Sequence, residues 1–280
     1  MSIYKKLREI PDGYLGLLSI LFMLIPVLYP LGLPIEISEP TKGFYNTLMN
    51  LPEGSIVCID ASGGFASWDE FHASMVATLK VLFSRPIKWF AWGYGYDGPV
   101  MVDVVLKEIN PQGFGKQYGS DYLVLPYVSG EEMAVAAVAS DTKSVFTSDF
   151  YGNSLSQYAL WNELGSADDY AIVITISGSC LNMDQETRQW YTIHGKKLLE
   201  INMACCSPMS MNYYPSVMPG GLWGVKGGTE LEVLSRFAGP GARLSDAQNL
   251  GLMPFILFLI LGNIGYFGGR FMEKEEEKRQ

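Results

Sequence analysis

The chain has 280 residues, a formal net charge of −9 and a hydrophobic fraction of 48%. Its charged fraction of 18% lies below the roughly 25% of an average soluble domain, and two uncharged membrane segments would account for part of that deficit. The acidic balance argues against nucleic acid as a partner, because phosphate backbones select basic surfaces.

The first apolar segment, residues 14–33, carries no charged side chain and has the length of about 20 residues that crosses a bilayer core. Pro26 and Pro30 would kink or end a helix in the second half of the segment. A cleaved signal peptide is the alternative, but its apolar stretch usually has only about 7–15 residues. We therefore predict a cytoplasmic N-terminus at residues 1–13 and an uncleaved membrane helix at residues 14–34.

The middle region, residues 35–246, alternates short apolar runs with stretches of helical periodicity. The runs predict strands at residues 55–60, 87–92, 122–125, 144–147, 171–176 and 198–203. The periodic stretches predict helices at residues 68–84, 99–109, 131–139, 184–194 and 229–237. This alternation is typical of crossover connections, so we predict an α/β fold with a mostly parallel Rossmann-like or flavodoxin-like sheet and helices on both faces.

Small and polar residues follow several of these predicted strands. In doubly wound sheets, ligands bind outside the carboxyl ends of the strands. The candidate ligand-binding residues at this edge are Asp60, Ser62, Gly63, Gly93, Ser177 and Cys180.

The run from Asp60 to Gly64 resembles the Asp-x-Ser-x-Ser motif with which von Willebrand factor A domains hold Mg²⁺ through carboxylate and hydroxyl oxygens. The resemblance implies a metal-dependent adhesion domain with Asp60 and Ser62 among the ligands. Gly64 stands at the position of the second serine, so one hydroxyl ligand is missing. We favour the simpler interpretation, a glycine turn that Asp60 caps, and predict no bound metal.

Two enzyme classes have partial sequence signals. The spelling Gly93-x-Gly95-x-x-Gly98 matches a dinucleotide-binding motif, but it follows the second strand, and Tyr94, Tyr96 and Asp97 would crowd a phosphate. The run Ser177-Gly178-Ser179-Cys180 lacks the frame of a nucleophile elbow, although a Cys180–His194 pair is conceivable. We therefore predict no cofactor and no catalytic residue.

The four cysteines are Cys58, Cys180, Cys205 and Cys206. Cys58 lies inside an apolar strand and is interpreted as a packed thiol. Because Cys205 and Cys206 are adjacent, we expect their side chains to point to different sides and to need separate partners. A disulfide between Cys180 and one of them is possible in an extracytoplasmic domain.

Residues 205–228 are rich in proline and glycine and read as one long loop. Long ordered loops are often functional or interfacial, and this one has an unusual apolar content. Either it packs over the sheet edge, or it contacts a partner or the membrane surface, which is the interpretation we favour. The residues predicted to carry this contact are Met209, Met211, Tyr213, Tyr214, Met218 and Trp223.

The second apolar segment predicts a membrane helix at residues 247–269, followed by a cytoplasmic tail at residues 270–280. Short basic flanks stay in the cytoplasm, so we expect both termini there and the middle domain outside. Small residues and an amide inside the apolar run indicate either packing against another helix, within the chain or between copies, or a glycine-rich helix end at the membrane surface. The predicted packing residues are Gly262, Asn263, Gly265 and Gly269.

Three stretches carry a resemblance to a known family: residues 115–122, residues 145–152, and residues 171–176 together with Trp190. They are similar to an uncharacterised family of prokaryotic membrane-anchored proteins, which implies an α/β domain between two terminal membrane helices. We expect a non-catalytic assembly or interaction subunit of a membrane complex that self-associates or binds other membrane subunits. The alternative is a ligand-binding or hydrolytic domain with its site at the carboxyl ends of the strands.

Overall fold

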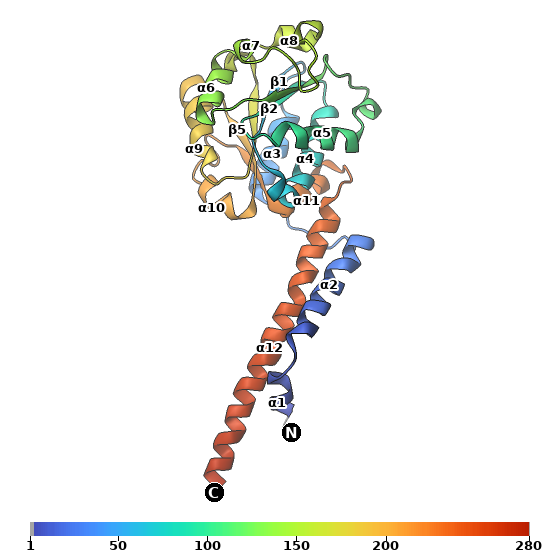
Figure 1. The fold of residues 1–280 in the computed structure, drawn as a ribbon, viewed down its shortest axis with the longest axis vertical. Helices are drawn as coiled ribbons and strands as arrows, with labels where there is room; N and C mark the ends of the chain where they lie inside the picture. Colours follow the sequence, from blue (N-terminus) through green and yellow to red (C-terminus); the bar gives the residue numbers. More distant parts are fainter. Residues whose placement is uncertain (1–2, 280) are drawn as a thin grey trace. The chain divides into compact units, whose positions relative to one another are not determined.

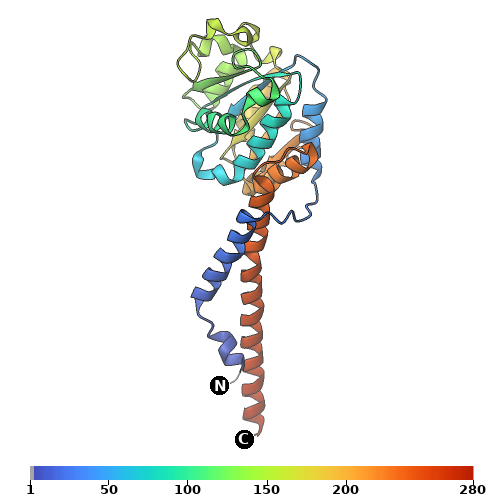
Figure 2. The same ribbon diagram turned by 90° about the vertical axis from the view of Figure 1, so that its right-hand side faces the viewer.

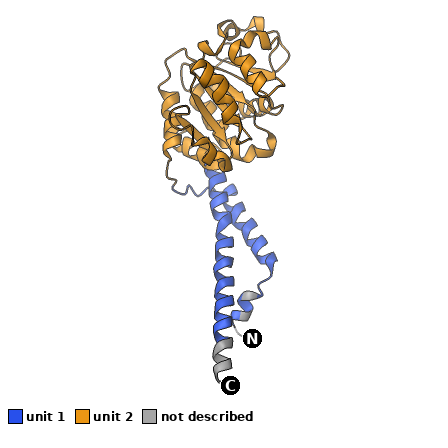
Figure 3. Ribbon diagram, turned by 90° about the vertical axis from the view of Figure 1, so that its left-hand side faces the viewer, with its two compact units in different colours: residues 1–34, 242–280 blue, residues 35–241 orange. Residues whose placement is uncertain are grey.

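The structure, a computed structural model, describes residues 3–279 (Figure 1). It divides into two compact units (Figure 3). One unit combines residues 1–34 with residues 242–280, and the other, the α/β unit, comprises residues 35–241.

The α/β unit is built on one sheet of six parallel strands in the order β3-β2-β1-β4-β5-β6. The strands are β1 (Ile56–Ala61), β2 (Lys88–Gly93), β3 (Tyr122–Tyr127), β4 (Ile172–Ser177), β5 (Leu198–Asn202) and β6 (Gly220–Trp223). The predicted parallel α/β sheet is confirmed, and its strand order is that of a Rossmann-like sheet, not the flavodoxin-like order. The order reverses between β1 and β4, and the loops that follow these two strands are called the switch point below.

Helices pack on both faces of this sheet, as two buried clusters show. Val57 and Ile59 of β1 lie in one cluster and Cys58 in the other, so the strand is buried on both sides. The main helices are α3 (Glu39–Met49), α4 (Trp68–Phe83), α5 (Gly98–Ile109), α6 (Glu132–Ser140), α8 (Ala159–Glu163), α9 (Asn182–Glu186) with the π-helix η5 (Thr187–Thr192), and α11 (Gly224–Ser235).

Two predictions about local structure are wrong. The strand expected at residues 144–147 is absent, because helix α7 (Thr142–Val145) begins there and the Asp141 side chain caps it by accepting from the Lys143 N–H. The expected long loop at residues 205–228 instead contains α10 (Ser207–Ser210), the strand β6 and the first turn of α11.

The β6 edge is covered by α3, which contacts both β6 and α11 (Figure 2). The backbones meet so closely that a Cβ atom at Gly43 would overlap Pro219 O, and one at Gly220 would overlap the Phe44 N–H. These glycines therefore serve close packing of a helix on a strand, and Gly220 lies where the sequence alone predicted part of a long loop.

The other unit consists of α1 (Ile3–Arg8), α2 (Asp12–Leu28) and α12 (Gly241–Arg279). Residues 241–272 form a helix long and apolar enough to cross a membrane, with a mean hydropathy of 2.0 in its most apolar window. Helix α2 is also apolar but has 17 residues, which span about 26 Å and so fall short of a core of about 30 Å. Among the described residues only α12 reaches the length of a full span.

The first membrane helix was predicted to continue to residue 34, and this is wrong. Helix α2 ends at Leu28, two residues before Pro30. The chain that follows is held by Asp246, whose carboxylate accepts from the N–H groups of Leu31, Gly32 and Leu33 at 2.8, 2.9 and 3.2 Å. Two spans, with both termini in the cytoplasm, stay a prediction.

Helix α12 approaches the N-terminal helices at glycines. A Cβ atom at Gly251 would lie 2.7 Å from Met23 Cγ, and one at Gly268 would overlap the Tyr4 ring. Of the predicted packing residues, Gly265 is buried, a Cβ atom at Gly269 would lie 3.9 Å from Tyr4 Cβ, and one at Gly262 would meet no atom within 4 Å. Asn263 Nδ2 donates to Leu259 O of its own helix at 2.9 Å.

Candidate functional site

All six residues predicted to bind a ligand lie at the carboxyl edge of the sheet. Parallel strands end at the same edge, so the loops after β1, β2 and β4 meet there. Asp60 lies on β1, and Ser62 and Gly63 follow it; Gly93 ends β2; Ser177 ends β4, and Cys180 follows it. Whether these residues bind a ligand stays a prediction.

The switch point is closed by direct contacts between its loops. The Ser62 N–H donates to Ile176 O of β4 at 2.8 Å, and Ser62 Oγ accepts from the Tyr94 N–H at 2.9 Å while donating to Asp60. The Ser62 hydroxyl therefore ties the turn after β2 to Asp60 of β1.

The glycines of Gly93-x-Gly95-x-x-Gly98 have a packing role. A Cβ atom at Gly93 or Gly98 would overlap Ala61 O, and one at Gly95 would lie 2.6 Å from Ser62 O. The turn between β2 and α5 therefore rests directly on the backbone that follows β1. The close backbone approach of these two loops gives the three glycines a structural reason that needs no phosphate.

Beneath this turn lies a buried pair of carboxyl groups, Asp60 and Glu186, each only 1% exposed. Burial raises the pKa of Asp60 to about 7. Burial, followed by the charge of Asp60, raises the pKa of Glu186 well above its usual range. Asp60 Oδ2 and Glu186 Oε2 have no N–H or O–H partner among the described residues, so a proton shared between the two carboxyl groups satisfies both.

Sequence reasoning missed Glu186. It precedes the π-helix η5, whose Trp190 is fully buried, and a π-helical turn in an otherwise α-helical stretch is frequent at functional sites. The register of a π-helix does not follow from apolar periodicity, so no local signal placed Glu186 opposite Asp60. Because both carboxyls are enclosed, the pair can store a proton but has no direct access to a bulky substrate.

A disulfide links the loops that follow β4 and β5. It joins Cys180 to Cys206, one of the pairings that the sequence left open. Cys58 is fully buried, as predicted. Cys205 is an exposed free thiol, and its sulfur lies 4.0 Å from that of Cys206. The expectation that the adjacent side chains point to different sides is wrong, because the tight 3₁₀ turn η6 (Ala204–Cys206) brings both sulfurs together.

The predicted interaction loop divides into buried and exposed residues. Met218 is fully buried, and Tyr213, Tyr214 and Trp223 are partly buried against the same cluster as Trp190. Met209 and Met211 are 52% and 42% exposed. Most of these residues therefore pack over the sheet edge, and only the two methionines are exposed enough to contact a partner.

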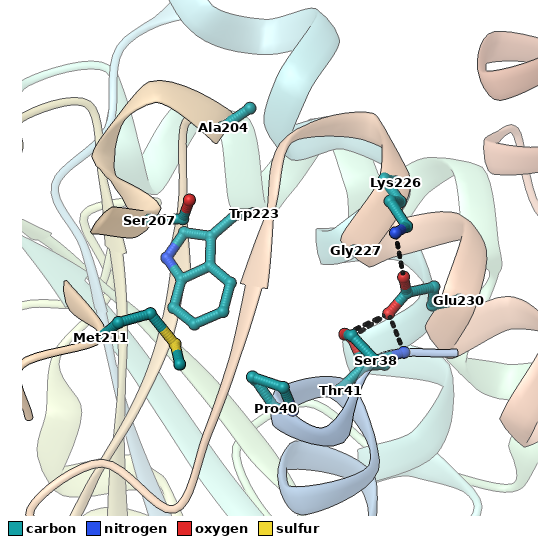
Figure 4. A pocket seen from close by; sticks show the side chains of 10 residues that line it. All are labelled: Ser38, Pro40, Thr41, Ala204, Ser207, Met211, Trp223, Lys226, Gly227 and Glu230. Carbon is teal, nitrogen blue, oxygen red and sulfur yellow. Dashed lines mark hydrogen bonds and ion pairs between the residues drawn. The ribbon is translucent and has the colours of Figure 1, made fainter. Parts of the chain in front are cut away.

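A cavity of about 300 Å³ lies farther along the same edge, beside β6 (Figure 4). This region, called the β6 corner below, is formed by the start of α3, the segment after β5, the end of β6 and the first turns of α11. Its lining residues are Ser38, Pro40, Thr41, Ala204, Ser207, Met211, Trp223, Lys226, Gly227 and Glu230. Of these, sequence reasoning had singled out Met211 and Trp223.

Glu230 is the buried charge of the β6 corner, with 1% exposure. Its Oε2 accepts from the Ser38 N–H at 3.1 Å, Ser38 Oγ at 2.6 Å and Thr41 Oγ1 at 2.5 Å. Its Oε1 faces the Lys226 ammonium at 3.4 Å (Figure 4). Glu230 thus caps the first turn of α3 and holds the entry of the chain into the α/β unit.

A second buried carboxyl, Glu200 of β5, lies behind Trp223. Burial raises the pKa of Glu200, while donors from Asn202, Ser210 and Trp223 act in the opposite direction. The Trp223 Nε1–H donates to Glu200 Oε2 at 2.7 Å. The indole is therefore held in a defined position at the wall of the cavity.

No protein-family model, curated protein or solved structure matches this chain. The likeness to membrane-anchored α/β proteins seen in the sequence therefore stays a resemblance.

Proposed function

We propose that the protein is a membrane-anchored, non-catalytic subunit whose α/β unit binds a protein partner through the carboxyl edge of its sheet. The observation that carries the proposal is the concentration of exposed large apolar side chains on the loops at this edge. Their exposed fractions range from 41% to 81%, and they are Phe65, Tyr96, Tyr127, Met133, Leu181, Met209 and Met211.

These residues follow five different strands, so they converge at one edge although they are far apart in the sequence. Large apolar side chains exposed elsewhere on the α/β unit are fewer: Val100 and Val104 share α5, and Tyr151, Ile193 and Val233 lie on separate segments. Each apolar side chain removed from water contributes roughly 25 cal/mol per Å² to an association, so this edge gains most from a partner.

The closed switch point supports a non-catalytic role. The contacts of Ser62 and the three glycines bring the loops after β1, β2 and β4 directly against one another at the edge where doubly wound folds bind their ligands. The Asp60–Glu186 pair next to it is enclosed. A subunit that binds a protein partner through this edge needs a firm surface there, and loops that pack against one another provide it.

We propose further that the α/β unit lies outside the cytoplasm, with α12 as its anchor. The basic flanks of the apolar segments support this orientation. The Cys180–Cys206 disulfide also supports it, because such bonds persist in oxidising compartments. The partner is a second copy of this chain or another subunit of the same membrane.

Site-specific photo-crosslinking of the full chain in its native membrane tests this function. Leu181 and Ile193 form a matched pair, because their side chains are 62% and 63% exposed but lie at opposite edges of the sheet. Leu181 follows the carboxyl end of β4, whereas Ile193 precedes the amino end of β5. A crosslinking side chain at residue 181 should give one defined product, and one at residue 193 should give none. A product of twice 31.0 kDa identifies a second copy. Equal products from both positions, or none from either, would contradict the proposal.

The cavity at the β6 corner favours a second candidate function, recognition of a small ligand. Its volume of about 300 Å³ is at the lower end of ordinary ligand sites, and its wall combines apolar side chains with a few polar groups. The two functions are compatible, since the cavity and the exposed apolar side chains lie along one edge and share Met211.

A further inference from the structure

We propose that the cavity at the β6 corner binds a small organic ammonium group, which lies between the Trp223 ring and the Glu230 carboxylate. The inference does not depend on the assembly function, because the residues that carry it, Trp223, Lys226 and Glu230, are not among the exposed apolar side chains of that function. In Figure 4 the two side chains lie on opposite sides of the cavity, with Pro40 and Met211 toward its floor in this view.

Glu230 offers an acceptor that its own neighbours leave incompletely used. All three short hydrogen bonds go to Oε2, from Ser38 and Thr41. Oε1 makes no hydrogen bond to the described residues, and the Lys226 ammonium lies 3.4 Å from it. That distance exceeds the roughly 2.7–2.9 Å of a charge-assisted hydrogen bond, so the carboxylate charge is incompletely paired and attracts a second cation from the cavity.

Lys226 is an internal competitor for this position and a weak one. Its side chain is 64% exposed. An ion pair of such a lysine is weak, because forming it reduces the conformational entropy of the side chain. When it swings into solvent, the Glu230 carboxylate faces the cavity with no cation beside it. A ligand ammonium then satisfies a charge that is 1% exposed and cannot be well hydrated.

Trp223 supplies the opposite wall. Indole is the best aromatic partner for a cation, and its donation to the Glu200 carboxylate makes the ring more electron-rich. The ring packs directly on Gly221, because a Cβ atom there would lie only 2.6 Å from Trp223 Cζ2. This contact adds to the hydrogen bond that holds the ring in position. The side chains of Pro40, Ala204 and Met211 add apolar surface that suits the methyl groups of a quaternary ammonium.

The sign of the charge decides between a cation and an anion. The first turn of α11 and Lys226 would attract an anion, since a helix N-terminus carries about half a positive charge. Against them stand the buried Glu230, Glu200 behind the indole, and Glu70, whose Oε2 accepts from the Ala204 N–H at 2.6 Å. Because the carboxylates outnumber the single exposed lysine, the balance favours a cation.

The full chain in dodecyl maltoside micelles, which contain no ammonium group, can be tested with tetramethylammonium chloride as the probe. Saturation-transfer NMR reports binding through the methyl protons. Two probes of similar size serve as controls, the neutral tert-butanol and the anionic acetate. We expect transfer to tetramethylammonium with a millimolar Kd and none to the controls.

Three variants locate the site. Lys226→Met removes the competing ammonium and should tighten tetramethylammonium binding about tenfold. Lys107→Met is the matched control, because Lys107 is a similarly exposed partner in an i,i+4 ion pair, with Asp103 on α5. It should leave binding unchanged. Glu230→Gln keeps the shape and an acceptor for Ser38 and Thr41, and should weaken binding at least tenfold.

The outcome does not depend on the stability of the Glu230 variant, since Lys226→Met changes only an exposed side chain. Three results would overturn the proposal: no transfer to tetramethylammonium in Lys226→Met, equal transfer to tert-butanol, or stronger transfer to acetate. If binding succeeds while the crosslinking at residue 181 fails, the ammonium site stands and the assembly function does not.

Discussion

The switch point and the β6 corner lie on the same edge of one sheet, yet they are built in opposite ways. At the switch point, short loops rich in glycine bring backbone against backbone, and the Asp60–Glu186 pair of buried carboxyls with raised pKa values lies underneath. At the β6 corner, side chains surround a cavity of about 300 Å³, and Glu230 faces it. The Rossmann-like strand order favours the first position for a ligand, but the side chains favour the second.

The difference arises from α3. This helix precedes β1 in the sequence but packs on β6, at the other end of the strand order from β3. It brings Ser38, Pro40 and Thr41 to the start of α11, whereas the switch point receives no such added element. A ligand position in this fold therefore depends on which segment covers the edge as well as on where the strand order reverses.

The largest effect on the free energy of unfolding is expected at the switch point, where backbone packs against backbone. Gly98→Ala places a Cβ atom on Ala61 O, so the turn after β2 cannot seat on β1, and we expect a loss of at least about 4 kcal/mol in the free energy of unfolding. Gly113→Ala is the control, because a Cβ atom there meets no atom within 4 Å. Thermal unfolding of the full chain in detergent measures both. A tolerated Gly98→Ala would show that the switch point is open.

The disulfide joins the two regions, because Cys180 follows β4 and Cys206 lies beside the cavity-lining Ala204 and Ser207. For a separation of 26 residues, Cys180→Ser should lower the free energy of unfolding by about 3 kcal/mol. It should also weaken tetramethylammonium binding at the β6 corner.

Cys205→Ser serves as the control for this prediction, since it removes a sulfur that takes no part in the bond. It should leave both quantities near those of the parent chain. If both serine variants lose the same stability, the exposed thiol and not the disulfide holds the two loops together.

The smallest of the three effects is a pH dependence at the switch point. Unfolded Asp60 ionises near its ordinary pKa of about 4, whereas in the folded chain its pKa is about 7. Between these values the folded state retains a proton that the unfolded state has released. Stability therefore falls as the pH rises through the folded pKa, by about 2.6 kcal/mol between pH 5 and pH 8.

Asp60→Asn should flatten this dependence, and unfolding measured from pH 4 to pH 8 would detect it. Glu186→Gln should act on the same pH window, and the double variant should add little, because the two carboxyls titrate as one pair. Strictly additive effects would instead mean that the groups ionise independently.

Much of the α/β unit was predictable because its signals are local. The apolar runs that form β1, β2, β4 and β5, and the helical periodicity of α4 and α5, each arise from residues close together in the sequence. The strand β6 was missed because Gly220 and Gly221 have low strand propensity, and it is the pairing with β5 and the packing of α3 that make them a strand. The six predicted ligand residues converge at one edge, but their loops pack against one another.

The sequence by itself determined an acidic chain with a long apolar C-terminal helix and a parallel α/β unit, since hydropathy and periodicity are properties of short windows. Only the tertiary structure decided which residues meet. It paired Asp60 with Glu186, Cys180 with Cys206, and Ser38 and Thr41 with Glu230. These partners are between 26 and 192 residues apart, and a contact over such a distance depends on how helices and strands pack, which no short window of sequence records.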